Sequence, residues 1–411
     1  MRILIYWEQE SWGGVDSHLL ELLSTWPVPD DEVVLMVNKG NRGFARLREN
    51  FARIPFVRSV KVVSCSHNEL NRRCRESRFL RHVPKLLHFL QPLTYWLSVR
   101  RLQRQFTSEG VFDLLLADNG GYPAAWGAIC AVEAGARAGI GARLMLVHHA
   151  AVPASPFMGW FEQIVDRRMN HLATAIVCVS RATRSALLRR RWIDEASLRI
   201  RVIPNGMRTD PHMKEVAAVN IRKSIGARAD EKLIGIVGRV SPYKGHEDLI
   251  FALARMSPNE RQQLRLVVIG SGDPQDEPER LKRIAKYLGV DDQVHFLGYV
   301  SGAPVSLIAQ LNMIVVATRS FEGFGLTLIE AMSVGVPVLA TDVGATSEFV
   351  TPEVGVLVQP GSPAELSDAL TNFVISPESW QRRACLAQQR LLDLKRDMAS
   401  EYRQFFVECL A

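Results

Sequence analysis

The sequence has few cysteines and no long apolar run. Its six cysteines are scattered over 411 residues and none forms a C-x-x-C pair, which excludes a zinc ribbon and favours free thiols in a reducing cytosol. No stretch approaches 18 uncharged apolar residues, so no segment is expected to span a membrane. The opening apolar run, Ile3–Trp7, is too short for the core of a signal peptide and is typical of a buried strand. We therefore expect a cytoplasmic protein.

Composition narrows the class further. Hydrophobic residues make up 47% and charged residues 23% of the chain, which excludes a disordered protein, a collagen-like repeat and a small disulfide scaffold. The length predicts two or three domains. Up to Asn205 there are 28 Lys and Arg against 18 Asp and Glu, and beyond it 22 against 25. The basic first half favours an anionic partner, which could be nucleic acid, a membrane surface or phosphorylated metabolites.

Apolar runs of strand length alternate with helical segments throughout. Strands that are buried on both faces and separated by helices predict parallel sheets in an α/β fold. The pattern restarts after the turn-rich Pro204-Asn205-Gly206, so we expect two doubly wound domains with ligands at the carboxyl ends of the strands. The expected strands are Ile3–Trp7, Val33–Val37, Leu114–Ala117, Leu144–Val147, Ala175–Val179, Leu233–Val237, Leu266–Ile269, Val294–Phe296, Met313–Ala317 and Val336–Ala340.

The first candidate site is the glycine pair Gly13-Gly14, which follows the first strand and precedes the helix-like Val15–Leu23. Paired glycines let backbone N–H groups approach an anion at a helix N-terminus, where the helix dipole is positive. A flexible turn between strand and helix is the alternative, and the pair alone is more typical of that turn.

The second candidate begins directly after the strand Leu233–Val237, where the chain reads Gly238-Arg239-Val-Ser-Pro-Tyr-Lys244-Gly245. The glycine and lysine spacing is not that of a P-loop. Two cations at the end of a buried strand are nevertheless suited to neutralise a diphosphate, with Gly238 and Gly245 leaving room for it. A solvated basic loop is the alternative.

The third candidate contains two carboxylates eight positions apart, Glu322 and Glu330, with a glycine-rich turn between Glu322 and Gly325. From Leu326 the pattern is helical, and eight residues are a little over two turns, so both acids can face one cleft. Carboxylates accept paired hydrogen bonds from sugar hydroxyls, and the free N–H groups of the turn suit phosphate or sugar oxygens. Two solvated glutamates are the alternative.

Together these motifs resemble the retaining glycosyltransferases of family 4, which have the GT-B fold. Glu322–Glu330 matches that family's E-x7-E motif, and Gly238–Gly245 resembles its G-R-x4-K-G segment. The resemblance covers most of residues 203–375 and is looser before that. It also includes Ile203-Pro-Asn-Gly206, Val268-Ile-Gly-Ser-Gly272, Val294-His-Phe-Leu-Gly298, Val336-Pro-Val-Leu-Ala-Thr-Asp-Val-Gly344 and Val179-Ser180-Arg-Ala-Thr. The family usually has two glycines where this chain has Gly344-Ala345.

The resemblance implies two Rossmann-like domains that face each other across a cleft. Residues 1–205 would bind the acceptor, residues 206–385 would bind the nucleotide-sugar, and a helical segment, 386–411, would pack back on the first domain. Arg239 and Lys244 would hold the donor diphosphate.

The resemblance also implies the remaining donor contacts. Glu330 would accept hydrogen bonds from the ribose hydroxyls, and Glu322 would grip the donor sugar. The expected donor-binding set also comprises Gly13, Gly14 and Gly238 and the backbone of Gly323, Phe324, Gly325 and Leu326.

A histidine at the end of a strand completes the implied catalytic set of Arg239, Lys244, Glu322 and His148. In the family this histidine contacts the transferred sugar, and neighbouring His149 leaves the register open between the two. A buried core histidine is the alternative for either residue.

The implied activity is transfer of a sugar from a nucleotide-sugar, the donor substrate, to a glycan or lipid-linked acceptor, with retention of anomeric configuration. We expect no cofactor, since the nucleotide-sugar is itself the donor substrate. We also expect no metal site, because Arg239 and Lys244 can neutralise the leaving group and the chain contains no Asp-x-Asp pair. Cell-surface polysaccharide or lipopolysaccharide synthesis would be its setting. A GT-B phosphorylase or sugar-nucleotide epimerase is the first alternative, and a basic nucleic-acid-binding protein is the second.

The richest basic stretch is Arg72–Arg104, where nine Lys and Arg stand against one acid and are interleaved with aromatic and aliphatic residues. Basic and apolar residues on short helices suit an anionic membrane surface, which would place the protein at the inner face of the plasma membrane. A solvated helical face over the domain core is the alternative. The basic side chains are Arg72, Arg73, Arg75, Arg78, Arg81, Lys85, Arg100, Arg101 and Arg104.

Overall fold

The computed structural model describes residues 1–9, 13–39, 41–63, 88–123, 126–206, 219–300, 304–393 and 397–411. The chain divides into two compact units, one of Met1–Gly206 with Asp397–Ala411 and the other of Met207–Arg396. The chain passes from the first unit to the second after Gly206, next to the boundary expected at residue 205. The expected segment 386–411 is not one piece, since its beginning belongs to the second unit and only its end belongs to the first.

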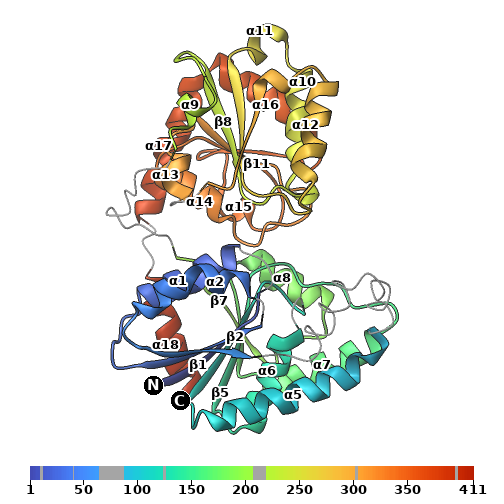
Figure 1. Cartoon of the computed structure of the whole chain (residues 1–411), viewed down its shortest axis with the longest axis vertical. Coiled ribbons are helices and arrows are strands. Elements are labelled where there is room, and N and C mark those ends of the chain that lie inside the picture. The colour runs from blue at the N-terminus through green and yellow to red at the C-terminus, as the bar shows by residue number, and fades with distance from the viewer. Residues whose placement is uncertain are drawn as a thin grey trace. The chain divides into compact units, whose positions relative to one another are not determined.

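The amino-terminal unit contains a parallel sheet of seven described strands in the order β3-β2-β1-β4-β5-β6-β7 (Figure 1). The strands are β1 (Arg2–Trp7), β2 (Glu32–Asn38), β3 (Val57–Val63), β4 (Leu114–Asn119), β5 (Ala142–Val147), β6 (Ala175–Cys178) and β7 (Arg199–Val202). The helices are α1 (Gly14–Ser24), α2 (Arg42–Ala52), α5 (Gln91–Ser108), α6 (Trp126–Arg137), α7 (Gly159–Leu172), α8 (Arg181–Arg190) and α18 (Met398–Leu410).

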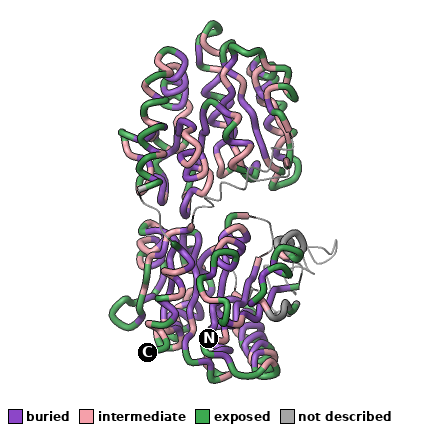
Figure 2. Tube along the Cα trace, turned by 90° about the vertical axis from the view of Figure 1, so that its left-hand side faces the viewer, coloured by how far each residue is buried: buried purple, intermediate pink, exposed green. Residues whose placement is uncertain are grey.

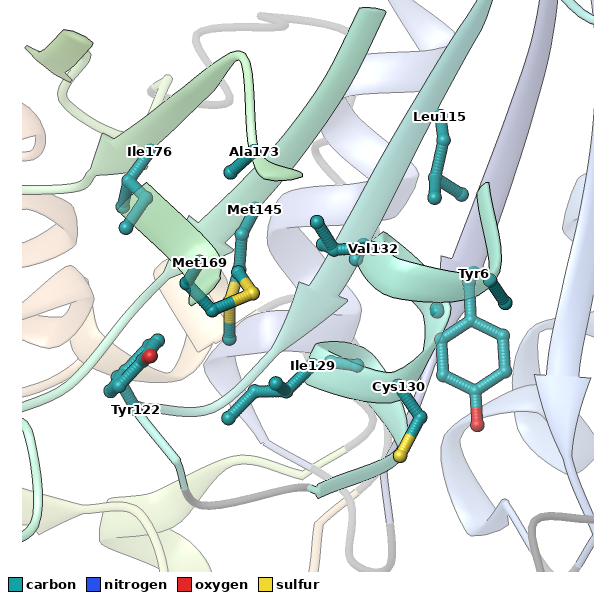
Figure 3. Close-up of a cluster of buried hydrophobic side chains, with 14 of the residues drawn as sticks. Tyr6, Leu115, Tyr122, Ile129, Cys130, Val132, Met145, Met169, Ala173 and Ile176 are labelled. Atoms are coloured by element: carbon teal, nitrogen blue, oxygen red, sulfur yellow. The ribbon is translucent and has the colours of Figure 1, made fainter. Parts of the chain in front are cut away.

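The central strands of this sheet are buried on both faces. Tyr6 of β1, Leu115 of β4 and Met145 of β5 pack in one cluster with Ile129 and Val132 of α6 (Figure 3). The residues that alternate with them along the strands are buried as well, and Figure 2 shows the strands as almost continuously buried. The continuous apolar runs in the sequence are therefore explained by helices that cover both faces.

The second unit contains a parallel sheet of six described strands in the order β10-β9-β8-β11-β12-β13. The strands are β8 (Lys232–Val237), β9 (Leu264–Ile269), β10 (Val294–Gly298), β11 (Met313–Val316), β12 (Val338–Thr341) and β13 (Val356–Val358). The helices are α9 (Ile221–Ser224), α10 (His246–Arg255), α11 (Pro258–Arg261), α12 (Glu277–Tyr287), α13 (Pro304–Ile308), α14 (Leu326–Ser333), α15 (Thr346–Phe349), α16 (Pro363–Ile375) and α17 (Pro377–Asp393).

Every strand expected from the sequence is present, with ends that differ by a few residues. Three further strands, β3, β7 and β13, were not expected, and each lies at an edge of its sheet. Among the described helices, none combines the length and the apolar character needed to cross a lipid bilayer.

Candidate functional site

The second unit brings the predicted cations and the first carboxylate of the E-x7-E motif together at the carboxyl end of β8 and β11. Lys244 Nζ lies 2.7 Å from Glu322 Oε2, and both side chains are partly buried. Thr318 Oγ1 donates to the same carboxylate oxygen at 3.1 Å. Arg239 Nη1 lies 3.0 Å from Oδ2 of Asp273. Arg239, Lys244 and Glu322 line one pocket.

The turn that presents Lys244 depends on the glycine that follows it. Gly245 has a φ of +71°, in the left-handed region that favours glycine. A Cβ atom at Gly245 would lie 1.9 Å from the carbonyl oxygen of Ala317, just beyond β11. The end of the G-R-x4-K-G segment is thus packed directly against the neighbouring strand end, which holds the lysine at the pocket.

The loop from Glu322 to Gly325 leads into α14. Gly325 precedes the helix, and Leu326 and Thr327 of the first turn line the pocket. The first N–H groups of a helix have no partner within it, and they carry the positive end of its dipole. This pocket therefore contains two cations and a helix start, which is a suitable combination for an anion.

The other residues of the predicted motif have different positions. The Phe324 ring is buried against Phe349, with ring centroids 4.8 Å apart, so its side chain belongs to the core. Gly323 is buried, and Glu330 is partly buried further along α14. Among the described residues that line the pocket, neither Gly238 nor Glu330 is included.

A second glycine, Gly344, fixes the backbone of Glu322. Its φ is +60°, and a Cβ atom there would lie 2.2 Å from the Glu322 carbonyl oxygen. The next N–H, from Ala345, donates to that oxygen at 2.8 Å. The Ala345 side chain is fully buried, so the turn accommodates alanine where the family usually has a second glycine.

In the amino-terminal unit, the predicted glycine pair forms the start of α1. Gly13 precedes the helix, Gly14 is its first residue, and the Gly13 N–H donates to Oδ2 of Asp16 at 2.6 Å. No described atom lies within 4 Å of a Cβ atom built on Gly13. Burial raises the pKa of Asp16 to about 7.

The two candidate histidines occupy different environments. His148 directly follows β5 and is buried, and its Nε2 atom lies 2.9 Å from Oδ1 of Asp118 at the end of β4. His149 is exposed. Burial raises the pKa of Asp118 to about 7 and lowers the pKa of His148 to about 3.

The sequence did not point to the partners of His148. The ring centroids of His18, on α1, and His148 are 4.7 Å apart. The ring centroids of His18 and Tyr402, on α18, are 5.6 Å apart. Burial lowers the pKa of His18 to about 3. One available signal was Asp118 itself, a charged residue that directly follows the apolar run Leu114–Ala117.

Part of the basic stretch lies outside the described residues, namely Arg72, Arg73, Arg75, Arg78, Arg81 and Lys85. The rest lies on α5, where Arg100, Arg101 and Arg104 are exposed. Large apolar side chains are exposed near the start of the same helix, and the Arg100 guanidinium lies 3.7 Å from the centroid of the Trp96 ring.

Two family models match the chain and together cover most of it. "Glycosyltransferase Family 4" matches residues 12–211, and "Glycosyl transferases group 1" matches residues 219–390. The chain belongs to glycosyltransferase family 4. The resemblance seen in the sequence is therefore confirmed.

Curated relatives match over part of the chain. An uncharacterised glycosyltransferase of Methanocaldococcus jannaschii is 36% identical over 173 residues, which cover 41% of this chain and 43% of that protein. A D-inositol 3-phosphate glycosyltransferase of Gordonia bronchialis is 32% identical over 226 residues, which cover 53% of this chain and 47% of that protein. The match thus spans less than half the length of these relatives.

A solved structure supports the fold over the whole chain. HepE from Anabaena, in complex with UDP, has a TM-score of 0.73 at 22% identity and covers 98% of both chains. The same protein has been solved with UDP-glucose. The predicted α/β fold of GT-B type is confirmed.

Proposed function

We propose that this chain is a retaining, metal-independent glycosyltransferase that moves a sugar from a nucleotide-diphosphate sugar to a glycan or lipid-linked acceptor. The observation that carries this proposal is the pocket of the second unit, where Arg239 and Lys244 lie beside Glu322 and the start of α14. Membership of family 4 supports it, as does the binding of UDP and UDP-glucose by HepE.

The chemistry follows from charge. The bond that breaks joins the anomeric carbon to the diphosphate, whose oxygens gain negative charge as it leaves. Lys244 and Arg239 stabilise that charge electrostatically, together with the N–H groups at the start of α14. A bond forms from the acceptor oxygen to the same face of the anomeric carbon, and the departing phosphate takes the acceptor proton. Two fixed cations supply the neutralisation that a metal ion supplies elsewhere.

Glu322 acts on the sugar in this proposal. Its carboxylate is held by Lys244 at 2.7 Å and by Thr318 at 3.1 Å, and a carboxylate still has lone pairs that accept bonds from sugar hydroxyls. The Glu322 carboxylate would lie beside the bound diphosphate, so both would interact with Lys244. Glu330 is proposed to accept hydrogen bonds from the ribose hydroxyls, and His148 is proposed to contact the transferred sugar.

The acceptor side of the proposal rests on the amino-terminal unit. Helix α5 buries one face, with Tyr95, Val99 and Phe106, and exposes another. Beneath the surface the two helices α5 and α7 are linked near their starts, because the buried Tyr95 and Phe161 rings lie 5.7 Å apart. The exposed apolar side chains of this region, here called the aromatic patch, are Phe89, Leu90, Leu93, Trp96, Leu97, Phe157, Trp160 and Ile164.

The aromatic patch and the arginines of α5 form a surface suited to an anionic membrane. Apolar side chains enter the headgroup region while Arg100, Arg101 and Arg104 attract the lipid phosphates. We propose that this surface places the enzyme at the cytoplasmic face of the plasma membrane. There it would meet a lipid-linked acceptor of cell-surface polysaccharide or lipopolysaccharide synthesis.

The decisive experiment is a calorimetric binding screen of UDP-, GDP- and ADP-sugars, followed by mass spectrometry of the products. Binding of one donor class, with release of the nucleoside diphosphate and mass gain on an acceptor, is the expected result. Consumption of inorganic phosphate would identify a phosphorylase, and an isomeric nucleotide-sugar would identify an epimerase. Salt-sensitive DNA binding with no donor binding would contradict the proposal.

A further inference from the structure

The amino-terminal unit contains a group of buried polar side chains, here called the acid–histidine cluster: Asp16, His18, Asp118, His148 and Tyr402. They come from α1, β4, the residue after β5, and α18. All five are buried, and Asp118 is fully inaccessible. Ionisable groups in such a place lower stability unless they are paired, so their presence needs an explanation.

Within the cluster, Asp118 is directed at His148. Its Oδ1 atom lies 2.9 Å from His148 Nε2, whereas its Oδ2 atom is buried and has no hydrogen-bond partner among the described residues. A carboxyl group that is wholly removed from water and makes one side-chain hydrogen bond does not recover its desolvation cost. The contact is therefore better explained by what it does to the imidazole than by stability.

The contact has a defined effect on the imidazole. Burial keeps His148 neutral, because it lowers the pKa of the ring to about 3. A neutral imidazole has one N–H donor and one acceptor nitrogen, and the partner of one nitrogen sets the role of the other. If ionised Asp118 accepts from Nε2–H, then Nδ1 carries the lone pair. If Asp118 is protonated and donates to Nε2, then Nδ1 becomes the donor.

We propose that Asp118 is a positioning residue that holds His148 as the Nε2–H tautomer, so that Nδ1 accepts a hydrogen bond from a substrate hydroxyl. This inference rests on the proposed function, since the hydroxyl belongs to the sugar that is transferred. The titratable groups around Asp118 are His148, His18 and Asp16, with Tyr402 from α18. The Cys178 thiol of β6 is close enough to Tyr402 to contribute to the raised pKa of its hydroxyl, although burial is the main cause.

The first test reads the tautomer directly. In protein labelled with ¹⁵N-histidine at pH 8, with His148→Gln used for assignment, we expect protonated Nε2 and unprotonated Nδ1 in the wild type. Asp118→Asn should shift this ratio toward Nδ1–H. Tyr402→Phe, whose buried hydroxyl has no hydrogen-bond partner in the described structure, should leave it unchanged. Predominant Nδ1–H in the wild type, or no change in Asp118→Asn, would overturn the inference.

The second test uses turnover. Asp118→Asn should lower kcat by at least about 10- to 100-fold, the range seen when the group that orients a metal-bound histidine is lost, with a much smaller change in donor KM. In the His148→Gln background the same substitution should have no further effect. An equal loss in both backgrounds would show that Asp118 does not act through His148. If no nucleotide-sugar is turned over, the proposed function fails, and the tautomer measurement still decides the role of Asp118.

Discussion

The ammonium group of Lys244 lies 2.7 Å from the carboxylate of Glu322, although the two residues are 78 positions apart in the chain. The contact joins the loop after β8 to the loop before α14. It also means that the charge proposed to hold a diphosphate is engaged by a carboxylate in this structure. When a donor binds, Lys244 must divide its interaction between Glu322 and the diphosphate. Substitution of Lys244 and substitution of Glu322 should therefore have different effects on donor binding.

Lys244→Ala should remove most turnover while the fold survives. The expected loss in kcat is about 10²- to 10³-fold, because the leaving diphosphate loses one preorganised cation. Glycosyl transfer assays with the donor found in the binding screen measure the loss, and circular dichroism monitors the fold. Lys286→Ala on α12, an exposed lysine, is the matched control. Near-normal transfer by Lys244→Ala would refute the assignment.

Glu322→Gln should separate affinity from turnover. Without the carboxylate, Lys244 no longer has an anionic partner, so the free nucleoside diphosphate should bind about three- to tenfold more tightly, corresponding to a change of about 1 kcal/mol. Turnover should fall because the sugar loses a hydrogen-bond acceptor. Calorimetry with the nucleoside diphosphate measures the first effect. Glu279→Gln, on an exposed side chain of α12, is the control, and weaker binding by Glu322→Gln would contradict this account.

Gly344→Ala should lower the free energy of unfolding of the second unit by more than the cost of placing an alanine in a left-handed backbone conformation. A left-handed backbone costs an alanine about 1–2 kcal/mol, and here the new Cβ atom would also lie 2.2 Å from the Glu322 carbonyl oxygen. Gly361→Ala is a matched control, because its φ is +69° and no described atom lies within 4 Å of its Cβ position. Equal losses in urea unfolding for the two variants would show that the close approach does not matter.

The central strands could be predicted from the sequence because both faces of each are covered, which produces continuous apolar runs. The edge strands lack this signal. In β7, exposed Arg199 and Arg201 alternate with partly buried apolar residues, and β13 is only three residues long. A short or half-exposed strand is hard to distinguish from a loop in a single sequence.

The candidate site also contains parts that the sequence could predict and parts that it could not. Lys244 and Glu322 belong to local motifs whose spacing is visible in the chain. The partners of His148 are not local, since His18 and Tyr402 come from opposite ends of the sequence and meet only in the folded unit. Asp118 carries a local signal, a charge at a strand end, but its pairing with His148 depends on the register of β4 against β5.

Asp118→Asn should alter how stability depends on pH. In the folded protein the carboxyl has a pKa of about 7, against an ordinary value of 3.8. Between pH 4 and pH 7 the folded state therefore retains a proton that the unfolded chain has released, so this group's stabilising contribution is complete at low pH and is lost as the pH rises. Asparagine does not titrate. The free energy of unfolding of the variant should rise relative to wild type by up to about 1.4 kcal/mol per pH unit in that window.

Urea unfolding at a series of pH values measures this difference. Asp276→Asn, on an exposed side chain, should change the free energy of unfolding by no more than about 0.5 kcal/mol at any pH. Asp16 and His18 are present in both proteins, but loss of the Asp118 charge removes an interaction that raises the pKa of each. Parallel curves for wild type and Asp118→Asn would show that Asp118 titrates normally in the folded state.

The aromatic patch should bind anionic membranes. The full chain should co-sediment with vesicles that contain phosphatidylglycerol and not with vesicles of phosphatidylcholine alone, because the arginines of α5 require anionic lipid. Replacing Trp96 and Trp160 with serine should weaken binding on the order of tenfold or more, since each indole contributes apolar area that enters the headgroup region. Tyr287→Ser on α12, whose side chain is 89% exposed, should bind as the wild type does. Equal sedimentation with both lipids, or no loss in the tryptophan variant, would assign α5 to the alternative of a solvated helical face.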